Sequence, residues 1–440
     1  MVNGRQPPRV FLGTQEISGL YRNLEIGMVG LGVSARLIIT HPHPFAYDQL
    51  TPNPWPARIA TAAVLRHRRT SGMVRYVWAI AFAVASAILL VWSLSRFDAY
   101  VFGWGLSILP GNLDLPILRL FRKRVVVVMG HGSEARPPYM STPEEGTTLL
   151  PTKKMLGDLE LRTRRVSSTV RRIERWSNVV IGLPTTGQFF SKPFVNFYRL
   201  GVATAESASP SRHDDDLTTA RPIVVLHVPS NPRVKGSAVI RACMAEVVAE
   251  FPSVTFREVT GVPHDEVLTA IRECTFVVDQ LWSDIPMAAV GAEAAAEGRA
   301  AVISGYAWDT WASLLRPEDM PPTILTTPEA LKTTIVDAIQ QIEATRAIGE
   351  AARRFVRSRW NVSAVAANYL RVVTGNIPAE WIVAPADVRY GWGCGVSKEK
   401  VETMVVGLVS TYGQRALRWR SATQAYDFLA GKSAAPRSTK

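Results

Sequence analysis

Cysteine is scarce in this chain, and the few that occur exclude two classes of site. Only three are present among 440 residues, Cys243, Cys274 and Cys394, and their spacing fits neither a disulfide framework nor a zinc site. This usage indicates a reducing compartment. Residues 1–8 are polar and lack the apolar core of a signal peptide, so we expect a cytoplasmic protein.

The chain also lacks internal repeats and, before a polar end after Gly431, any long low-complexity tract. Its length predicts two or three domains, and its 47% of apolar residues can form large cores. The stretch from 203 to 220 is rich in Ser, Thr and Asp, as is typical of a linker. We therefore predict a first domain over 1–202, a second over 221–360, and a C-terminal part over 361–440.

Short apolar runs alternate with helical patterns in both halves of the chain. Such alternation predicts parallel sheets with helices on both faces, so the expected fold class is α/β, with two Rossmann-like, doubly wound domains. The strands predicted in the first half cover 9–12, 35–40, 98–103, 125–129 and 179–182. The second half predicts strands over 223–228, 254–258, 275–279 and 300–303, helices over 237–250, 264–273 and 291–297, and a largely helical stretch over 335–373 broken near Trp360.

Acidic residues are under-represented in the first half. Residues 1–220 contain 26 Lys and Arg against 15 Asp and Glu, whereas residues 221–440 contain 24 against 22. A basic field of this kind attracts anionic lipid surfaces, polyanions or phosphorylated substrates, unless the clusters are solvated helix faces. Nucleic acid is disfavoured, because the arginines do not interleave with the aromatics of a known binding module. The basic clusters are Arg66, Arg68, Arg69 and Arg75, then residues 119–124, and then residues 162–175.

One apolar run, residues 76–94, contains no charged side chain. Its length is close to the roughly 20 residues that cross a bilayer. It lies, however, between two predicted strands, where a doubly wound fold needs a crossover helix, and a true span would put those strands on opposite sides of a membrane. We expect a buried or membrane-surface helix, and the span stays open as the alternative. Trp78 and Trp92 suit a membrane interface in either case.

A polar turn, VPSNPRVKGS at 228–237, leads from a predicted strand into a predicted helix. It places Lys235 just outside the C-terminal edge of a parallel sheet, where open α/β sheets bind their ligands. Glu293 opens a predicted helix after a later strand, so we expect it at the same edge. A Lys for phosphate groups and a Glu for ribose hydroxyls are the residues that a sugar-nucleotide site needs.

These motifs, taken in order, resemble those of glycosyltransferases with the two-Rossmann-domain (GT-B) architecture, closest to family 4. The resemblance covers about residues 9–375 and implies two domains that face a central cleft, with a C-terminal helix within 353–369 that crosses back to the first domain. The matching segments are GTQEISG at 13–19, DAYVFG at 98–103, LPGNLDLP at 109–116, HGSE at 131–134, PSNPRVKG at 229–236, GVPHDEV at 261–267, DQL at 279–281 and GAEAAAEG at 291–298.

The resemblance implies a role for each matched residue. Lys235 would neutralise the donor diphosphate, Glu293 would bind the ribose, and His131 would lie beside the transferred sugar. No metal or other cofactor is implied, because amide groups and the dipole at a helix N-terminus can hold phosphate. The further donor-binding residues implied are Gly13, Gly19, Ser230, Asn231, Arg233, Asp284 and Ala294.

The activity that the resemblance implies is hexosyl transfer from a nucleotide diphosphate sugar to an acceptor hydroxyl, with retention of configuration. The basic first half and residues 76–94 suggest a lipid-linked or cell-envelope polysaccharide acceptor, and an enzyme peripheral to the inner face of the cell membrane. Two metal motifs are discounted. His41 and His43 lack a third ligand, and the acidic run 214–216 falls in the predicted linker, where a solvated charge run is expected.

The sequence departs from the family pattern at two positions. Ile285 stands where the first acid of the usual Glu-x7-Glu pair belongs, although Asp284 could replace that acid through a shifted loop. Ser230 stands where a basic residue is common. Two alternatives therefore stay open. One is a catalytically altered relative or nucleotide-sugar epimerase, and the other is a membrane-anchored interaction protein in which residues 76–94 span the bilayer.

Overall fold

The computed structural model describes residues 7–16, 18–42, 50–141, 151–204, 222–388, 392 and 395–419. The chain forms two compact units. Unit 1 comprises residues 1–135, 165–203 and 362–387, and unit 2 comprises residues 136–164, 204–361 and 388–440. Most of the predicted linker, the acidic run 214–216, His43, Cys394 and the polar end after Gly431 lie outside the described residues.

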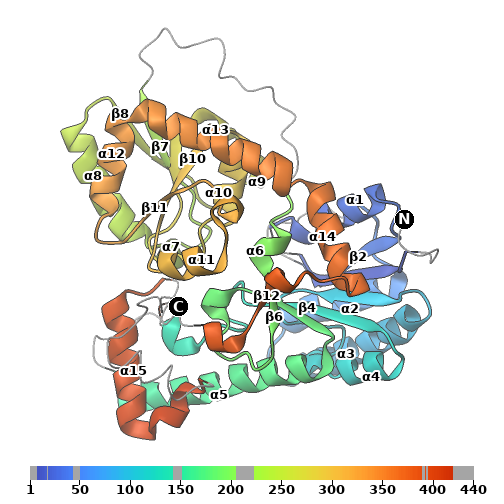
Figure 1. The fold of residues 1–440 in the computed structure, drawn as a ribbon. Helices are drawn as coiled ribbons and strands as arrows, with labels where there is room; N and C mark the ends of the chain where they lie inside the picture. Colours follow the sequence, from blue (N-terminus) through green and yellow to red (C-terminus); the bar gives the residue numbers. More distant parts are fainter. Residues whose placement is uncertain are drawn as a thin grey trace, which may run out of the picture. The chain divides into compact units, whose positions relative to one another are not determined.

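Unit 1 is built on a seven-stranded sheet (Figure 1). Its strands are β1 (Val10–Gln15), β2 (Ala35–His41), β3 (Ala99–Phe102), β4 (Arg124–Val128), β5 (Val179–Gly182), β6 (Phe194–Asn196) and β12 (Ile382–Val383). They lie in the order β12-β6-β5-β4-β3-β1-β2, and β12 runs antiparallel to β6. Because β1 pairs in parallel with both β2 and β3, the direction of winding reverses at β1, as in doubly wound folds.

Helices cover this sheet, and the strands are accordingly almost continuously apolar, as parallel strands buried on both faces must be. The helices are α1 (Leu20–Gly30), α2 (Trp55–Arg69), α3 (Gly72–Leu94), α4 (Asp114–Leu120), the part of the long α5 (Lys153–Trp176) from residue 165 onward, α6 (Phe197–Leu200) and α14 (Val362–Thr374). α14 packs tightly on α1, since a Cβ atom added to Gly27 would lie 2.1 Å from the carbonyl oxygen of Val362.

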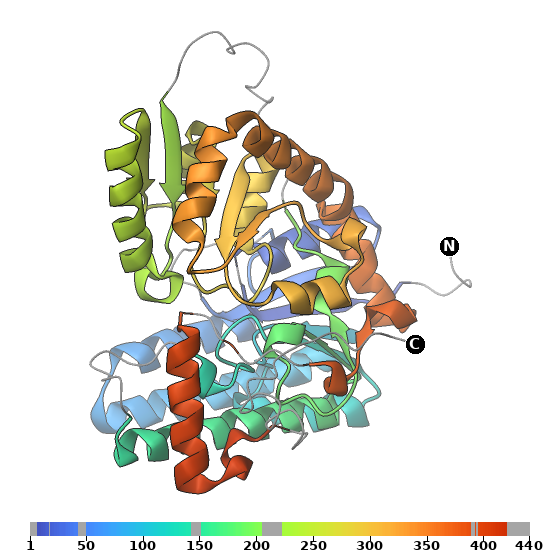
Figure 2. The same cartoon turned by 60° about the vertical axis from the view of Figure 1, so that its left-hand side comes forward.

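Unit 2 is a five-stranded, fully parallel sheet (Figure 2). Its strands are β7 (Ile223–His227), β8 (Val254–Glu258), β9 (Phe276–Val278), β10 (Ala300–Ser304) and β11 (Ile324–Thr326), in the order β11-β10-β9-β7-β8. Its helices are α7 (Pro232–Lys235), α8 (Ser237–Glu250), α9 (His264–Glu273), α10 (Ala289–Ala296), α11 (Trp308–Leu314), α12 (Leu331–Gln340), α13 (Ile342–Arg359) and α15 (Lys398–Tyr412). Separate buried clusters lie under α8 with α12 and under α9 with α10.

The predicted fold class, with two Rossmann-like doubly wound sheets, is confirmed. Several boundaries differ from the prediction. β1 continues to Gln15 and so contains Gly13, α10 begins at Ala289, and the long C-terminal helical stretch has an additional break at Gln341. Ala288 has an extended backbone, with φ −91° and ψ −174°, and this sets the start of α10 without any capping side chain that the sequence would reveal.

Residues 136–164 belong with unit 2, in contrast to the predicted first domain over 1–202. The reason lies in contacts to the segment after α15. The hydroxyl of Tyr139 donates to the carbonyl oxygen of Leu417 over 2.8 Å, and Arg418 pairs with Glu160 at 3.1 Å. These contacts fix Leu417 and Arg418, which belong to the tail beyond residues 9–375, the part of the chain that resembles known enzymes.

Helix α3 contains the apolar run that was predicted to be either a surface helix or a membrane span. It is a crossover helix, because it connects β2 to β3, and both strands pair with β1 in one sheet. A transmembrane α3 would separate these strands, so the intact sheet excludes it. Among the described residues α3 alone has the length and composition to cross a membrane, and only 28% of its most apolar window is buried.

Candidate functional site

The loops that follow β7, β8 and β9 meet at the C-terminal edge of the second sheet. Strand order reverses between β7 and β9, and a doubly wound sheet binds its ligand at such a reversal. His227, which ends β7, joins the ends of β7 and β9 to the start of α8. Its ring forms hydrogen bonds with the carbonyl oxygen of Val278 at 2.7 Å and with the hydroxyl of Ser237 at 2.8 Å. Burial lowers the pKa of His227, so the ring is neutral at neutral pH.

Lys235 and Asp279 form an ion pair at this reversal point. The Nζ atom of Lys235 lies 2.6 Å from Oδ1 of Asp279, and their side chains are 12% and 0% exposed. The amide of Leu281 donates to the carbonyl oxygen of Lys235 over 3.0 Å, which fixes the two loops to each other. Lys235 is therefore where the sequence predicts it, and a buried carboxylate orients its ammonium group. The pair uses one of the three N–H donors of that group.

The turn before Lys235 is held by backbone hydrogen bonds and by the side chain of Asn231. Oδ1 of Asn231 accepts the amide of Val234 at 3.3 Å and so caps α7, while Pro232 has no N–H to offer. Gly236 then starts α8 with φ 73°, and a Cβ atom there would lie 2.6 Å from that of Leu281. Only glycine fits this position, and it lets the chain turn sharply so that α8 begins at the same edge. The side chains of Ser230 and Arg233 are exposed in the turn before Lys235.

Glu293 also reaches this edge, although not from the start of its helix. It lies in the second turn of α10, with 22% of its side chain exposed, and its Oε1 is 2.8 Å from Nε2 of His264, the first residue of α9. The hydrogen bond that the His264 ring donates to Glu293 raises the pKa of His264. The acid predicted to bind ribose is therefore paired with a histidine to which the sequence assigned no role.

Two predicted donor-binding residues of unit 2 are placed differently from the prediction. Ala294 is the sixth residue of α10 and packs in the core beneath it, with Leu226 and Ala270, at 0% exposure. Its predicted place at the start of the helix is wrong, because α10 begins earlier and Ala294 is interior, and its contact with the donor stays a prediction. Asp284 is 3% exposed and forms an ion pair with Arg136. Its contact with the sugar stays a prediction, and sequence reasoning missed the arginine.

In unit 1 the predicted glycine loop begins later than expected. Gly13 lies inside β1, and a Cβ atom there would lie 2.1 Å from the carbonyl oxygen of Ile38 in β2, so the missing side chain allows close strand packing. The predicted place of Gly13 in a loop is therefore wrong, and its role at the donor stays a prediction. Gly19 does stand in a turn, at the N-cap of α1 with φ 75°. The buried Glu16 accepts the amides of Tyr21 and Arg22 at 3.1 and 2.7 Å, and so occupies the amides that an anion would need.

His131 follows β4 in a loop that is braced by Glu134. Oε1 of Glu134 accepts the amides of Gly130 and His131 at 2.8 and 2.9 Å. The His131 ring packs edge-on against Phe197, with centroids 4.3 Å apart. Both ring nitrogens are shielded from water and have no hydrogen-bond partner among the described residues. Such an unpaired polar atom costs about 1–3 kcal/mol, which a ligand hydroxyl could recover.

The burial of His131 predicts an acid-sensitive stability. Burial lowers the pKa of its imidazole from 6.5 to about 4, so the unfolded chain takes up a proton at a higher pH than the folded chain. The free energy of unfolding should therefore fall as the pH drops from about 6.5 to about 4, by at most ~3 kcal/mol for this group. Urea unfolding of wild type and of His131→Gln across this range measures the effect. A variant with the same pH dependence as wild type would contradict it.

Metal-ligand clusters are not found in the described part of the chain, since no three His, Cys, Asp or Glu side chains converge there. Three residues of the site have no role in the sequence analysis, although Asp279 and His264 fall within quoted motifs and Arg136 lies just past another. The position of Asp279 directly after a strand was the signal for it. Nothing local in the sequence marks Arg136, because its partner Asp284 is 148 residues away.

No protein-family model and no curated protein matches the chain. Solved structures resemble it at low identity. One is HepE of Anabaena in complex with UDP-glucose, which is 12% identical, with a TM-score of 0.48 over 84% of this chain and 100% of that one. A second is the trehalose 6-phosphate synthase of Burkholderia multivorans, which is 12% identical, with a TM-score of 0.48 over 84% and 97%. A third is MnaA of S. aureus with UDP, 8% identical, with a TM-score of 0.43 over 84% and 97%.

Proposed function

We propose that the chain is a GT-B glycosyltransferase, which moves a hexosyl group from a nucleotide diphosphate sugar to an acceptor hydroxyl. The observation that supports this most is the pair of Lys235 with Asp279 where strand order reverses in the second sheet. A cation fixed by a buried carboxylate at this place suits an anion bound in the crevice. A nucleoside diphosphate also explains Glu293 at the same edge, because its ribose offers hydroxyl donors to a carboxylate.

The proposed reaction breaks the bond between the anomeric carbon and a diphosphate oxygen. Negative charge then develops on the departing diphosphate. Lys235 and the first amides of α8 would stabilise it, and each such preorganised donor typically contributes about 3 kcal/mol. The acceptor oxygen attacks from the leaving-group side, which retains the configuration, and its proton passes to the departing phosphate oxygen. We propose that these groups act without a metal ion.

His131 would orient the transferred sugar rather than carry a covalent intermediate. Its ring is neutral at neutral pH, because burial lowers its pKa to about 4. A neutral imidazole offers one N–H donor and one acceptor nitrogen, which suits a sugar hydroxyl. The two shielded ring nitrogens support this role, since they have no other partner in the described part of the chain.

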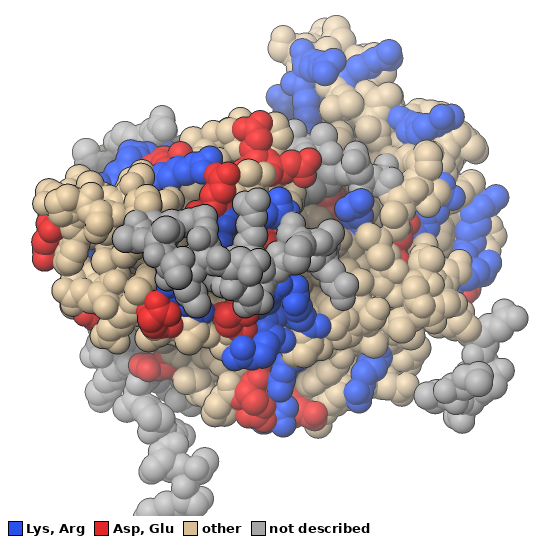
Figure 3. All heavy atoms as spheres, turned by 90° about the horizontal axis from the view of Figure 1, so that it is seen from above, with Lys and Arg blue, Asp and Glu red and all other residues tan. Residues whose placement is uncertain are grey.

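The surface of α2 and α3 supports a site of action at an anionic membrane. Met73, Val77, Ile80, Val84 and Val91 are exposed by 55–86% and recur at helical spacing along one face of α3. Residues 49–97, which include both helices, contain six arginines and no acid. In Figure 3 the lobe that projects at the top of the view carries Lys and Arg and no Asp or Glu. An apolar stripe beside uncompensated arginines is typical of a helix that lies in a bilayer interface.

A thermal-shift panel tests the donor assignment. UDP, GDP, ADP and their sugar conjugates are compared with and without Mg²⁺. A ligand at a hundred times its Kd stabilises the folded state by about 2.7 kcal/mol, so the correct nucleotide should raise Tm clearly. We expect the shift to survive EDTA. A panel without any shift would contradict the proposal, and conversion of a bound sugar to its epimer without an acceptor would favour the epimerase.

Glu293→Gln tests the ribose contact. A charge-assisted hydrogen bond is worth about 1.5–3 kcal/mol, so the variant should bind the matching nucleoside diphosphate about tenfold to a hundredfold more weakly. Inorganic pyrophosphate, which has no ribose, should bind both proteins alike. Glu297→Gln is the matched control, because Glu297 lies one turn further along and pairs with Arg272. Equal nucleotide binding by both variants would exclude the role of Glu293.

A further inference from the structure

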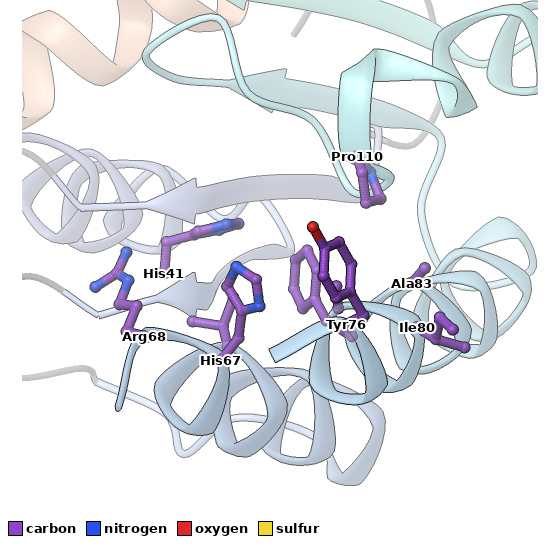
Figure 4. Close-up of a pocket in the computed structure, with 10 residues that line it drawn as sticks. His41, His67, Arg68, Tyr76, Ile80, Ala83 and Pro110 are labelled. Carbon is purple, nitrogen blue, oxygen red and sulfur yellow. The ribbon is translucent and has the colours of Figure 1, made fainter. Parts of the chain in front are cut away.

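A hollow of about 590 Å³ lies beside the end of β2 in unit 1 (Figure 4). This volume is within the range of small-molecule sites, about 300–1,000 Å³. β2, α2 and α3 contribute most of its walls, and Pro110, after β3, closes one side. Because His41 ends β2 and Pro110 follows β3, the hollow opens at the C-terminal edge of the first sheet, the edge where such sheets bind ligands.

The two sides of the hollow differ in chemistry. Figure 4 shows His41, His67 and Arg68 on one side, and Tyr76, Ile80 and Ala83 with Pro110 on the other. Burial and the charge of Arg68 lower the pKa of His41 to about 4, so Arg68 carries the fixed charge of the polar side at neutral pH. Its segment contains no acid to compensate that charge.

The apolar side continues onto the exposed stripe of α3. Ile80 both lines the hollow and belongs to that stripe, with 66% of its surface exposed. A hydrocarbon chain that leaves a bilayer in contact with α3 could therefore enter the hollow without crossing a polar surface. Burying such a chain is favourable by about 0.8 kcal/mol for each CH₂ group.

We propose that this hollow binds the hydrocarbon chain of a phosphorylated amphiphile, with the phosphate held by Arg68. Arginine matches the oxygen geometry of phosphate. His67 beside it contributes no donor, because Arg75 engages both of its ring nitrogens, at 3.0 and 3.4 Å. The role of this amphiphile as the acceptor of the sugar rests on the proposed glycosyl transfer, whereas its binding does not.

Binding of decyl phosphate below its micellar concentration tests the proposal, measured by titration calorimetry. Ala83→Trp fills the apolar side and should weaken binding at least tenfold, while Ala87→Trp makes the same change on an exposed position of the same helix and should have no effect. Arg68→Gln should weaken binding of decyl phosphate about tenfold, the usual size of a lost charge-assisted hydrogen bond, and leave decanol binding unchanged.

Two results would overturn the proposal. One is equal binding of decyl phosphate by wild type and a folded Ala83→Trp variant, with folding checked by circular dichroism. The other is an unchanged affinity in Arg68→Gln. The nucleotide thermal-shift panel, repeated on the same variants, separates the two ideas. If decyl phosphate binds as expected and no nucleotide binds, the result supports amphiphile binding in the hollow and contradicts the proposed glycosyl transfer.

Discussion

Replacing Lys235 with Met should abolish most of the transfer activity and also destabilise the fold. Loss of one preorganised cation at the departing diphosphate should lower kcat/KM by about 10²–10³-fold. The same change leaves the buried Asp279 without its partner, and breaking a buried pair costs about 3–5 kcal/mol. Steady-state kinetics with the donor found in the thermal-shift panel, together with urea unfolding, measure the two effects.

The double variant Lys235→Met with Asp279→Asn separates activity from stability. A neutral asparagine removes the uncompensated charge, so most of the lost stability should return while the activity stays low. Lys332→Met is the matched control, because Lys332 pairs with Glu246 at 2.8 Å on the surface of the same unit, where solvent screening leaves such pairs little effect on stability. A folded Lys235→Met variant with wild-type kcat/KM would remove the central support for the proposed function.

Introducing charge into the apolar stripe of α3 should release the protein from membranes. Val77 and Val84 are 61% and 55% exposed on this stripe and lie outside the hollow. Full burial of one valine is worth at least about 1.5 kcal/mol, so Val77→Glu with Val84→Glu should lower the partition coefficient at least about a hundredfold. Flotation with vesicles of phosphatidylcholine, with and without phosphatidylglycerol, measures it.

The controls for this experiment use equally exposed valines elsewhere. Val239 and Val406 are 45% and 58% exposed in unit 2, and Val239→Glu with Val406→Glu should leave flotation unchanged. The arginines of α2 and α3 should add a component that fades with salt, at about 1 kcal/mol for each charge near the surface. Wild-type protein that fails to bind phosphatidylglycerol vesicles at low salt would reject the membrane proposal.

The sheets of this protein are predictable from the sequence because their strands are continuous apolar runs. The run at 179–182 and the helices over 237–250 and 264–273 have the predicted boundaries in the structure. The start of α10 was missed, since an extended Ala288 sets it rather than a capping residue. The predicted start at residue 291 is two residues too late, so Ala294 was expected near the beginning of the helix. With the start at Ala289, Ala294 lies in the helix interior and is buried.

The candidate site was predictable where a residue lies in the segment that leaves the end of a strand, and not where long-range pairing decides. Lys235 was predicted in this way, because the turn after β7 lies at the C-terminal edge of the sheet. Asp279, directly after β9, has the same signal, although the sequence analysis gave it no role. Long-range pairing decides the contacts Asp284–Arg136 and Glu293–His264. Their partners are far apart in the sequence, and no local pattern signals the contact. The left-handed Gly236 was visible only as a glycine in a turn.

The packing of α14 on α1 has a consequence for synthesis of the chain. α14 begins at Val362, and it contributes Val365, Ala366, Tyr369 and Val372, each 0% exposed, to the first unit. Translation therefore produces residues 1–361 before it reaches α14, the helix that covers α1 in the first unit. A nascent chain stalled before α14 would display uncovered apolar surface on α1, where a chaperone could bind it until translation ends.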